Sequence, residues 1–256
     1  CGGGQTPADS SGQGGSASAD QQVPPAATEP VTLKVADSFP AGHWMPTRGT
    51  QPWMKRVEEL TGGQVKFEYY PSEQLGKLSD MLNLLKSGVT DIAYLAPSSL
   101  GGDLPLNGVG FLPGAFITSA EGSAAYAQLL AEGPVLEEYR KHGVRPLFGI
   151  LLPSYEIVSV EDPVGQLSDL KGLKIRTSGS TQDLVITALG GVPVSIPTPE
   201  VYTALQRGTV DAAVFPYASV KDYKVDEVIK HATFGAGVTS FAVVYAISDA
   251  SWNKLS

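Results

Sequence analysis

Hydrophobic and polar positions along the chain follow two periods, one typical of strands and one typical of helices. Residues 31–35 alternate as a strand, Trp53, Val57 and Leu60 share one helical face, and residues 65–70 are again strand-like. The same patterns predict, in chain order, a helix at 78–85, a strand at 91–95, a helix at 120–142 broken near 133–134, strands at 144–151, 157–160 and 173–176, a helix at 182–189, a strand at 192–196, a helix at 198–208, strands at 211–215 and 239–247, and a helix at 248–255. This alternation predicts an α/β fold with parallel sheets covered by helices on both faces.

A binding site is expected in the loops that follow the predicted strands. In open α/β sheets, ligands bind at the carboxyl ends of the strands, where the strand order reverses. The loops at these ends are residues 38–44, 70–74, 94–98, 153–156, 176–180 and 215–219. We therefore expect the binding residues in these loops.

Composition and charge argue against a nucleic-acid partner and against a membrane-spanning helix. The chain has 256 residues, of which 42% are apolar and 17% charged, an ordinary balance for one or two globular domains. Its net charge of -8 leaves no basic stripe to neutralise phosphates, so a nucleic-acid partner is not expected. No run approaches the roughly 20 apolar residues of a membrane-spanning helix.

The first residues predict a lipid anchor and a tether. Cys1 is the single cysteine, and Cys1-Gly2-Gly3-Gly4 resembles the mature end of a bacterial lipoprotein after its signal peptide has been cleaved. We expect lipidation at Cys1, with a cloning remnant as the alternative. Residues 1–30 are rich in Gly, Ser, Ala, Gln and Pro, so they are predicted to form a flexible tether reaching about 30 Å.

Motifs for catalysis or metal binding are absent from the sequence. The chain has three histidines with no paired spacing and one cysteine, so no metal site is predicted. It lacks the Gly-x-Ser-x-Gly, Walker and Gly-x-Gly-x-x-Gly patterns, and no cofactor is expected. An enzyme is disfavoured, although catalytic triads can assemble from distant positions.

Five segments carry a resemblance to one family. They are DLKGLKIR at 169–176, YPSEQLG at 70–76, LKSGVTDIAY at 85–94, GFLPGAF at 110–116 and LGGVPVSIPTPEVYTALQRGTVDAA at 189–213. In this order they resemble the extracytoplasmic solute receptors of TRAP transporters, the DctP-type family. The resemblance extends over residues 31–256.

This resemblance implies a two-lobed, periplasmic-binding-protein-like fold of type II, with a hinge and a ligand cleft between the lobes. It implies a first lobe of residues 31–151 plus 239–247 and a second of 152–238 plus 248–256. The family usually continues with long C-terminal helices beyond the position of Ser256, so we expect either a fragment or a shorter C-terminus than usual. It further implies a monomeric receptor that binds a small organic carboxylate and delivers it to TRAP membrane subunits.

Arg176 is the strongest candidate for binding the carboxylate. It ends a predicted strand directly before residues 178–181, whose amides begin a helix, and a guanidinium beside a helix N-terminus suits a carboxylate. The alternative is an ion pair with Asp169 or Asp183. The resemblance implies that Arg176 clamps the substrate carboxylate.

Two positions depart from the family's pattern. Where many members carry a second arginine, this chain has Glu156, which could contact a ligand amine or hydroxyl, balance Arg176, or simply face water. The segment after Asp211 reads Val214-Phe215-Pro216-Tyr217, without the acid that binds a metal in some relatives. Phe215 is therefore predicted to form a stacking wall.

Other candidates come from the same strand ends. Tyr94, Tyr155 and Tyr217 are possible phenolic donors, although buried tyrosines commonly belong to the core. His43 and Trp44 lie in the first strand-to-helix loop, where the family often contacts its ligand. Gln74, in the loop after the second strand, completes the set.

The single arginine facing an aromatic residue predicts the ligand class. We expect a monocarboxylate with an apolar or aromatic body. A ligand-binding co-receptor for a sensor is an alternative that the sequence leaves open, as is an enzyme on the same two-lobed scaffold.

Overall fold

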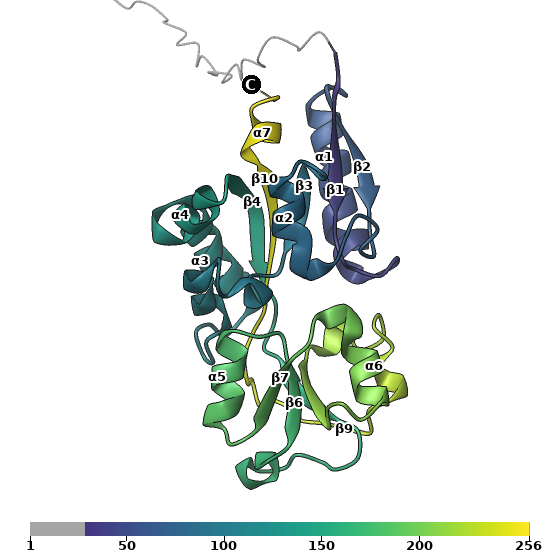
Figure 1. Cartoon of the computed structure of the whole chain (residues 1–256), viewed down its shortest axis with the longest axis vertical. Helices are drawn as coiled ribbons and strands as arrows, with labels where there is room; N and C mark the ends of the chain where they lie inside the picture. Colours follow the sequence, from purple (N-terminus) through teal and green to yellow (C-terminus); the bar gives the residue numbers. More distant parts are fainter. Residues whose placement is uncertain (1–28, 256) are drawn as a thin grey trace, which may run out of the picture.

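Two mixed β-sheets organise residues 29–255, which are the residues that the computed structural model describes. The first sheet has the order β2-β1-β3-β10-β4 and the second β7-β6-β8-β5-β9. The strands are β1 Val31–Ala36, β2 Val65–Tyr70, β3 Ile92–Leu95, β4 Val144–Leu151, β5 Glu156–Ser159, β6 Lys174–Thr177, β7 Val192–Ser195, β8 Ala212–Phe215, β9 His231–Ala232 and β10 Ala242–Ser248. Figure 1 shows the sheets in two lobes, one above the other.

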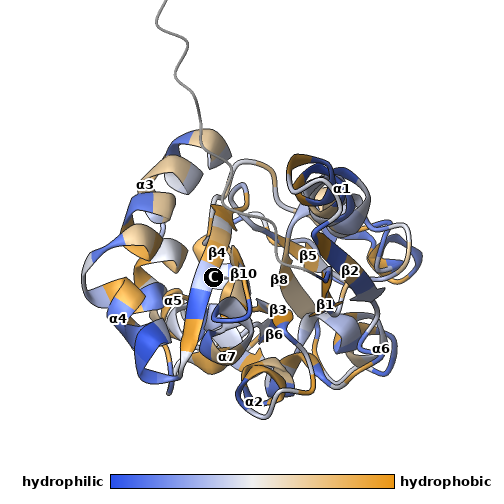
Figure 2. Cartoon of the chain, turned by 90° about the horizontal axis from the view of Figure 1, so that it is seen from above, coloured by the Kyte–Doolittle hydropathy of each residue, from blue (hydrophilic) through white to orange (hydrophobic). Residues whose placement is uncertain are grey.

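Helices flank both sheets. They are α1 Gln51–Leu60, α2 Met81–Lys86, α3 Ser119–Ala131, α4 Gly133–Lys141, α5 Thr181–Ala188, α6 Val201–Gln206 and α7 Asp249–Trp252. Seen from above, the helices surround the central strands, where β3 and β5 are coloured as hydrophobic (Figure 2). The α/β class and the predicted alternation of strands and helices are confirmed.

The predicted break within residues 120–142 has a clear local cause. Thr118 caps α3, because its hydroxyl accepts a hydrogen bond from the Glu121 amide at 3.2 Å. Gly133 then adopts a φ of +79°, which L side chains rarely adopt, and Pro134 occupies the first turn of α4. One apolar stretch therefore becomes two helices.

The prediction that the sheets are parallel is wrong for one inner strand of each sheet, β10 in the first and β5 in the second. β1 pairs in parallel with β2 and β3, but β10 runs antiparallel to both β3 and β4. In the second sheet β5 is antiparallel to β8. These exceptions are the strands by which the chain enters one lobe from the other, so no crossover helix fixes their direction.

Two chain segments cross between the lobes side by side. The first leads from β4 to β5 and the second leads into β10. The Tyr155 amide donates to the Thr239 carbonyl at 2.7 Å, and the Leu152 amide donates to the Phe241 carbonyl at 2.8 Å. These backbone bonds join the two crossings into one hinge region.

Residues 248–255 were predicted to join the second lobe, and this is wrong. The Asp249 amide donates to the Gly143 carbonyl at 2.8 Å, and Lys254 Nζ lies 3.3 Å from Asp91 Oδ1. Both partners belong to the first lobe. The reason is that β10 already lies in the first sheet, and α7 follows it with no further crossing. Cys1 and residues 1–28 of the predicted tether lie outside the described residues.

Close packing of α3 on β4 gives a prediction for stability. A Cβ at Gly149 in β4 would overlap Leu130 Cδ1 and come within 3.2 Å of Tyr126 Cε1. Gly149→Ala should therefore destabilise the protein by about 1–3 kcal/mol through overpacking. Thermal unfolding measures this as a Tm lower by several degrees. Gly102→Ala is the matched control because a Cβ there meets nothing within 4 Å, and equal Tm values for the two variants would contradict the packing argument.

Candidate functional site

Arg176, in β6, is a fully buried cation with no carboxylate partner. Its side chain is 0% exposed, and none of the acidic residues within 29–255 forms an ion pair with it. Nε donates to the Ile196 carbonyl at 2.8 Å, Nη2 to Thr198 Oγ1 at 3.0 Å, and Nη1 to the Val214 carbonyl at 3.4 Å. Burial lowers the pKa of Arg176 to about 10, so the group is still charged at neutral pH.

The donor count of the guanidinium shows what it can still bind. A guanidinium has five N–H groups, and three are used by the protein. One N–H on each terminal nitrogen remains, which is the number that a bidentate carboxylate requires. Because Nε already donates to the Ile196 carbonyl, a carboxylate can make a bidentate contact only with Nη1 and Nη2.

The alternative ion pairs of Arg176 are excluded by the positions of the two aspartates. Asp169 Oδ2 accepts from the Gly165 amide at 3.0 Å, at the turn before its own short helix. Asp183 accepts from Ser195 Oγ at 2.8 Å and also from Thr177. Both carboxylates serve local structure, and the buried guanidinium remains without a counterion.

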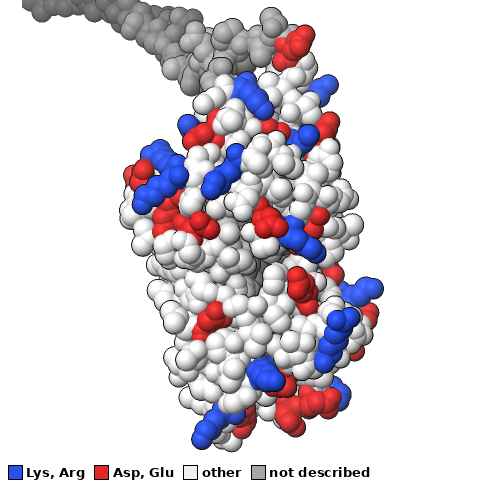
Figure 3. All heavy atoms as spheres, viewed as in Figure 1, with Lys and Arg blue, Asp and Glu red and all other residues white. Residues whose placement is uncertain are grey.

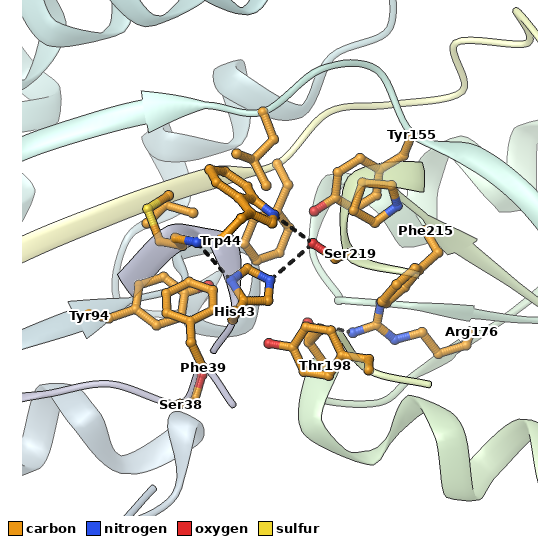
Figure 4. Close-up of a pocket in the computed structure, with 16 residues that line it drawn as sticks. Ser38, Phe39, His43, Trp44, Tyr94, Tyr155, Arg176, Thr198, Phe215 and Ser219 are labelled. Atoms are coloured by element: carbon orange, nitrogen blue, oxygen red, sulfur yellow. Dashed lines mark hydrogen bonds between the residues drawn. The ribbon is translucent and has the colours of Figure 1, made fainter. Parts of the chain in front are cut away.

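Arg176 lines a small cavity between the two lobes (Figure 4). Its volume is about 20 Å³, close to the space of a single water molecule. Most of the side chains around it are aromatic or aliphatic, and Arg176 is the only lysine or arginine among them. The lining residues are Ser38, Phe39, His43, Trp44, Met45, Tyr94, Leu152, Tyr155, Arg176, Thr198, Phe215, Pro216, Ser219, Tyr223, Phe241 and Val243.

Aromatic rings form the walls of the cavity from both lobes. In the first lobe Phe39 stacks on Tyr94 with ring centroids 4.6 Å apart, and on His43 at 4.8 Å. In the second lobe Phe215 meets Tyr223 edge-on at 5.9 Å. Flat faces on opposite sides of one space suit a flat apolar body.

Three tyrosine hydroxyls in the lining are available to a ligand. Tyr94, Tyr155 and Tyr223 are buried, and within residues 29–255 their hydroxyls make no hydrogen bond. Burial raises the pKa of each of these phenols, so all three stay protonated at neutral pH. Arg176 interacts electrostatically with all three. Neutral phenols beside a guanidinium can add hydrogen bonds to a bound carboxylate.

The lobes meet at one side of the cavity through His43 and Trp44. His43 Nε2 lies 3.1 Å from Ser219 Oγ, and Trp44 Nε1 donates to the same oxygen at 3.2 Å. Asp222 Oδ2 lies 3.6 Å from His43 Nε2. Figure 4 shows the two rings reaching Ser219 from the opposite lobe. These contacts close the cleft over the cavity.

Glu156 does not reach the cavity, which corrects each role predicted for it. It is only 6% exposed, so it does not face water, and its carboxylate accepts from Thr233 Oγ1 at 2.6 Å and from the amides of Gly235 and Ala236 at 3.0 and 3.1 Å. Successive residues of extended chain point to opposite sides, so Tyr155 faces the cavity and Glu156 faces away. Glu156 instead holds the loop that leads into the second crossing.

Tyr217 and Gln74 also lie outside the cavity. Tyr217 is 47% exposed and its hydroxyl donates to the Thr233 carbonyl. Gln74 is exposed on the loop after β2. The start of α5, predicted to assist Arg176, does not line the cavity either, because Thr181 Oγ1 donates to the Gly108 carbonyl of the first lobe at 3.3 Å.

The structure thus brings six predicted residues together and adds others. The six are His43, Trp44, Tyr94, Tyr155, Arg176 and Phe215. Thr198, Ser219 and Tyr223 were not predicted. Ser219 lies in one of the strand-end loops where binding residues were expected, whereas Thr198 was expected only as the first residue of a predicted helix. Tyr223 follows no strand directly, so no signal pointed to it.

Residues 29–255 contain no cluster of three or more His, Cys, Asp or Glu side chains that could hold a metal ion. No helix in this part of the chain is long and apolar enough to cross a bilayer. On the face in Figure 3, basic and acidic side chains are interspersed.

Comparisons with known proteins identify related chains. The profile of the DctP family, described as bacterial extracellular solute-binding protein, family 7, matches residues 40–256. The C4-dicarboxylate-binding periplasmic protein DctP of Rhodobacter capsulatus is 32% identical over 241 residues, which are 90% of this chain and 69% of that one. The chain spans 49–66% of the length of several other curated relatives.

Solved structures show the same fold. A TRAP periplasmic solute binding protein from Bordetella bronchiseptica, with bound (R)- and (S)-mandelate, has a TM-score of 0.82 at 26% identity, covering 89% of this chain and 72% of that one. A TRAP solute binding protein from Rhodoferax ferrireducens, in complex with copurified benzoate, also has a TM-score of 0.82, at 27% identity and covering 88% and 71%. The predicted two-lobed fold is confirmed.

The burial of His43 gives a prediction for pH dependence. Burial lowers the pKa of His43 to about 4, against a smaller opposing effect of Asp222, so the folded protein holds it neutral. The unfolded chain takes up a proton near pH 6.5, and stability should therefore fall between pH 6.5 and 4 and level off below. Tm measured against pH should fall less steeply in His43→Gln. His142→Gln, outside the cavity, should retain the wild-type slope, and a parallel curve for His43→Gln would contradict the assignment.

Proposed function

The chain belongs to the DctP family of bacterial extracellular solute-binding proteins, and from this premise we propose that it is the solute receptor of a TRAP-type transporter. Family members are solute-binding proteins of transport systems. In this chain the ligand would be a small organic monocarboxylate with an apolar or aromatic body, bound between the lobes without chemical change. Delivery to the transporter's membrane subunits would follow.

The buried, unpaired guanidinium of Arg176 carries this proposal. A cation that has lost its water and has no counterion is unfavourable on its own, and a bound anion removes the penalty. The two free N–H groups and the nearby phenols offer a carboxylate several charge-assisted hydrogen bonds. A purely structural arginine would be expected to pair with one of its neighbouring aspartates.

The cavity lining supports the choice of a monocarboxylate. Arg176 is the only lysine or arginine in it, and His43 is neutral, so a second carboxylate would be buried without a cation to balance its charge. Phe39, Phe215 and the tyrosines instead offer apolar faces. Two structural relatives were solved with mandelate and with benzoate, both aromatic monocarboxylates.

Binding requires the lobes to separate and close again. The cavity of about 20 Å³ is far smaller than the ~150 Å³ of a protein cavity that accommodates benzene. Opening at the contacts of His43 and Trp44 with Ser219 would admit the acid, and the lobes would then close around it with a wider cavity than in this structure. Closure is favourable only when contacts to both lobes are made, which couples binding to the surface presented to the transporter.

We also propose that the protein acts as a monomer held at the membrane by a lipid on Cys1. The sequence Cys1-Gly2-Gly3-Gly4 supports this anchor. Two or more acyl chains give stable attachment where one is marginal. Mass spectrometry of the protein purified from membranes would detect the acyl chains.

A thermal-shift screen tests the central proposal. The purified protein is scanned with benzoate, mandelate, pyroglutamate and succinate at rising concentrations. At a hundred times the dissociation constant, a monocarboxylate should stabilise the fold by about 2.7 kcal/mol, or about 5–10 °C. Arg176→Met should lose this shift because the carboxylate loses its partner.

Arg207→Met is the matched control, since Arg207 is an exposed arginine of the same lobe. It should respond like the wild type. Equal shifts in the Arg176 and Arg207 variants would mean that the acid binds elsewhere. A larger shift with succinate than with any monocarboxylate would contradict the proposed ligand class.

A further inference from the structure

Ser219 occupies an unusual position in the closing contact, because two donors from the other lobe meet at its hydroxyl. The first donor is His43. The Met45 amide donates to His43 Nδ1 at 3.0 Å, so Nδ1 is the unprotonated nitrogen and Nε2 carries the hydrogen. Nε2 therefore donates to Ser219 Oγ, at 3.1 Å.

Trp44 is the second donor. Its indole Nε1, which can only donate, lies 3.2 Å from the same oxygen. Two N–H groups occupy both lone pairs of the Ser219 hydroxyl, which leaves its own hydrogen as the group still to be bonded. Within residues 29–255 no acceptor receives a hydrogen bond from Ser219 Oγ. Ser219 is only 4% exposed, so bulk water does not replace that acceptor.

The free hydrogen of Ser219 belongs to the end of the cavity away from Arg176. Figure 4 shows the guanidinium beside Thr198 at one end, and Ser219 nearer the other, where His43 and Trp44 reach it. Ser219 and Arg176 both line the cavity, and most of the other lining side chains are apolar or aromatic. A ligand held by its carboxylate at Arg176 therefore directs its far end toward Ser219.

We propose that Ser219 is a specificity-determining residue that selects acids carrying a hydrogen-bond acceptor at the end opposite the carboxylate. This rests on the proposed function of the same cavity. An aromatic monocarboxylate with a hydroxyl on the ring satisfies the Ser219 hydrogen, whereas a methyl group of the same size leaves that hydrogen buried and unbonded.

Lobe closure sets this selectivity. In an open cleft the Ser219 hydroxyl rotates freely and bonds to water. When His43 and Trp44 arrive from the other lobe, they occupy its lone pairs and fix its hydrogen toward the cavity. The donor is therefore oriented only in the closed form, and the acceptor on the ligand contributes to closure itself.

Isosteric pairs of acids test the proposal by calorimetry on the full chain. The pairs are 3-hydroxybenzoate with 3-methylbenzoate and 4-hydroxybenzoate with 4-methylbenzoate. In the wild type, the hydroxy acid of at least one pair should bind about tenfold or more tightly than its methyl partner. In Ser219→Ala that ratio should fall to about one or below, because the donor is gone. Ser168→Ala, an exposed serine of the same lobe, should keep the wild-type ratio.

The ratio of the affinities for the hydroxy and methyl acids distinguishes recognition of the ligand by Ser219 from a role of Ser219 in lobe closure alone. If Ser219 only joins the lobes, Ser219→Ala weakens both acids of a pair equally and keeps the ratio, which overturns the proposal. Binding of methyl acids as tightly as hydroxy acids by the wild type overturns it as well. Failure of all four benzoates also overturns it, and the wider acid screen with Arg176→Met then decides whether the receptor proposal stands.

Discussion

The guanidinium of Arg176 is the constraint on which the rest of the site depends. It is buried in the second lobe, bonded to two carbonyls and to Thr198, and left without a carboxylate. Losing water without gaining a counterion lowers its pKa to about 10, a sign that the fold tolerates an unfavourable charge. Such a group persists only where its surroundings hold it, and here β6, β8 and the segment around Ile196 do so. The charge is therefore oriented before any anion arrives.

Aromatic rings from both lobes surround the space beside the guanidinium. Phe39 and Tyr94 pack together in the first lobe and Phe215 and Tyr223 in the second, so the two walls enclose one space only when the lobes are together. The paired backbones of the two crossing segments would keep the lobes attached during the proposed opening at Ser219. In the proposed receptor, binding and closure would therefore be coupled.

Much of the fold could be predicted because its elements arise from local patterns. The break at Gly133-Pro134 and the strand at residues 65–70 follow from backbone preference and side-chain period alone. The direction of β5 and β10 could not be predicted in this way. A strand's direction depends on which lobe the chain arrives from, and no local pattern encodes that. Residues 248–255 were assigned to the wrong lobe for the same reason, because local sequence patterns do not encode the topology.

The residues of the site also fall into two groups, those predictable from local sequence patterns and those that only the tertiary structure brings in. The sequence by itself determined that Arg176, Phe215 and Tyr94 end strands, and a strand end is where an α/β fold exposes polar groups to a ligand. Tertiary structure decided that Tyr155 faces the cavity while Glu156 turns away to hold a loop, because the pleat alternates and only packing fixes its register. It also decided the roles of Ser219 and Tyr223. Their partners lie well over a hundred residues away in the chain, and contacts across a closing cleft leave no periodic trace in either segment.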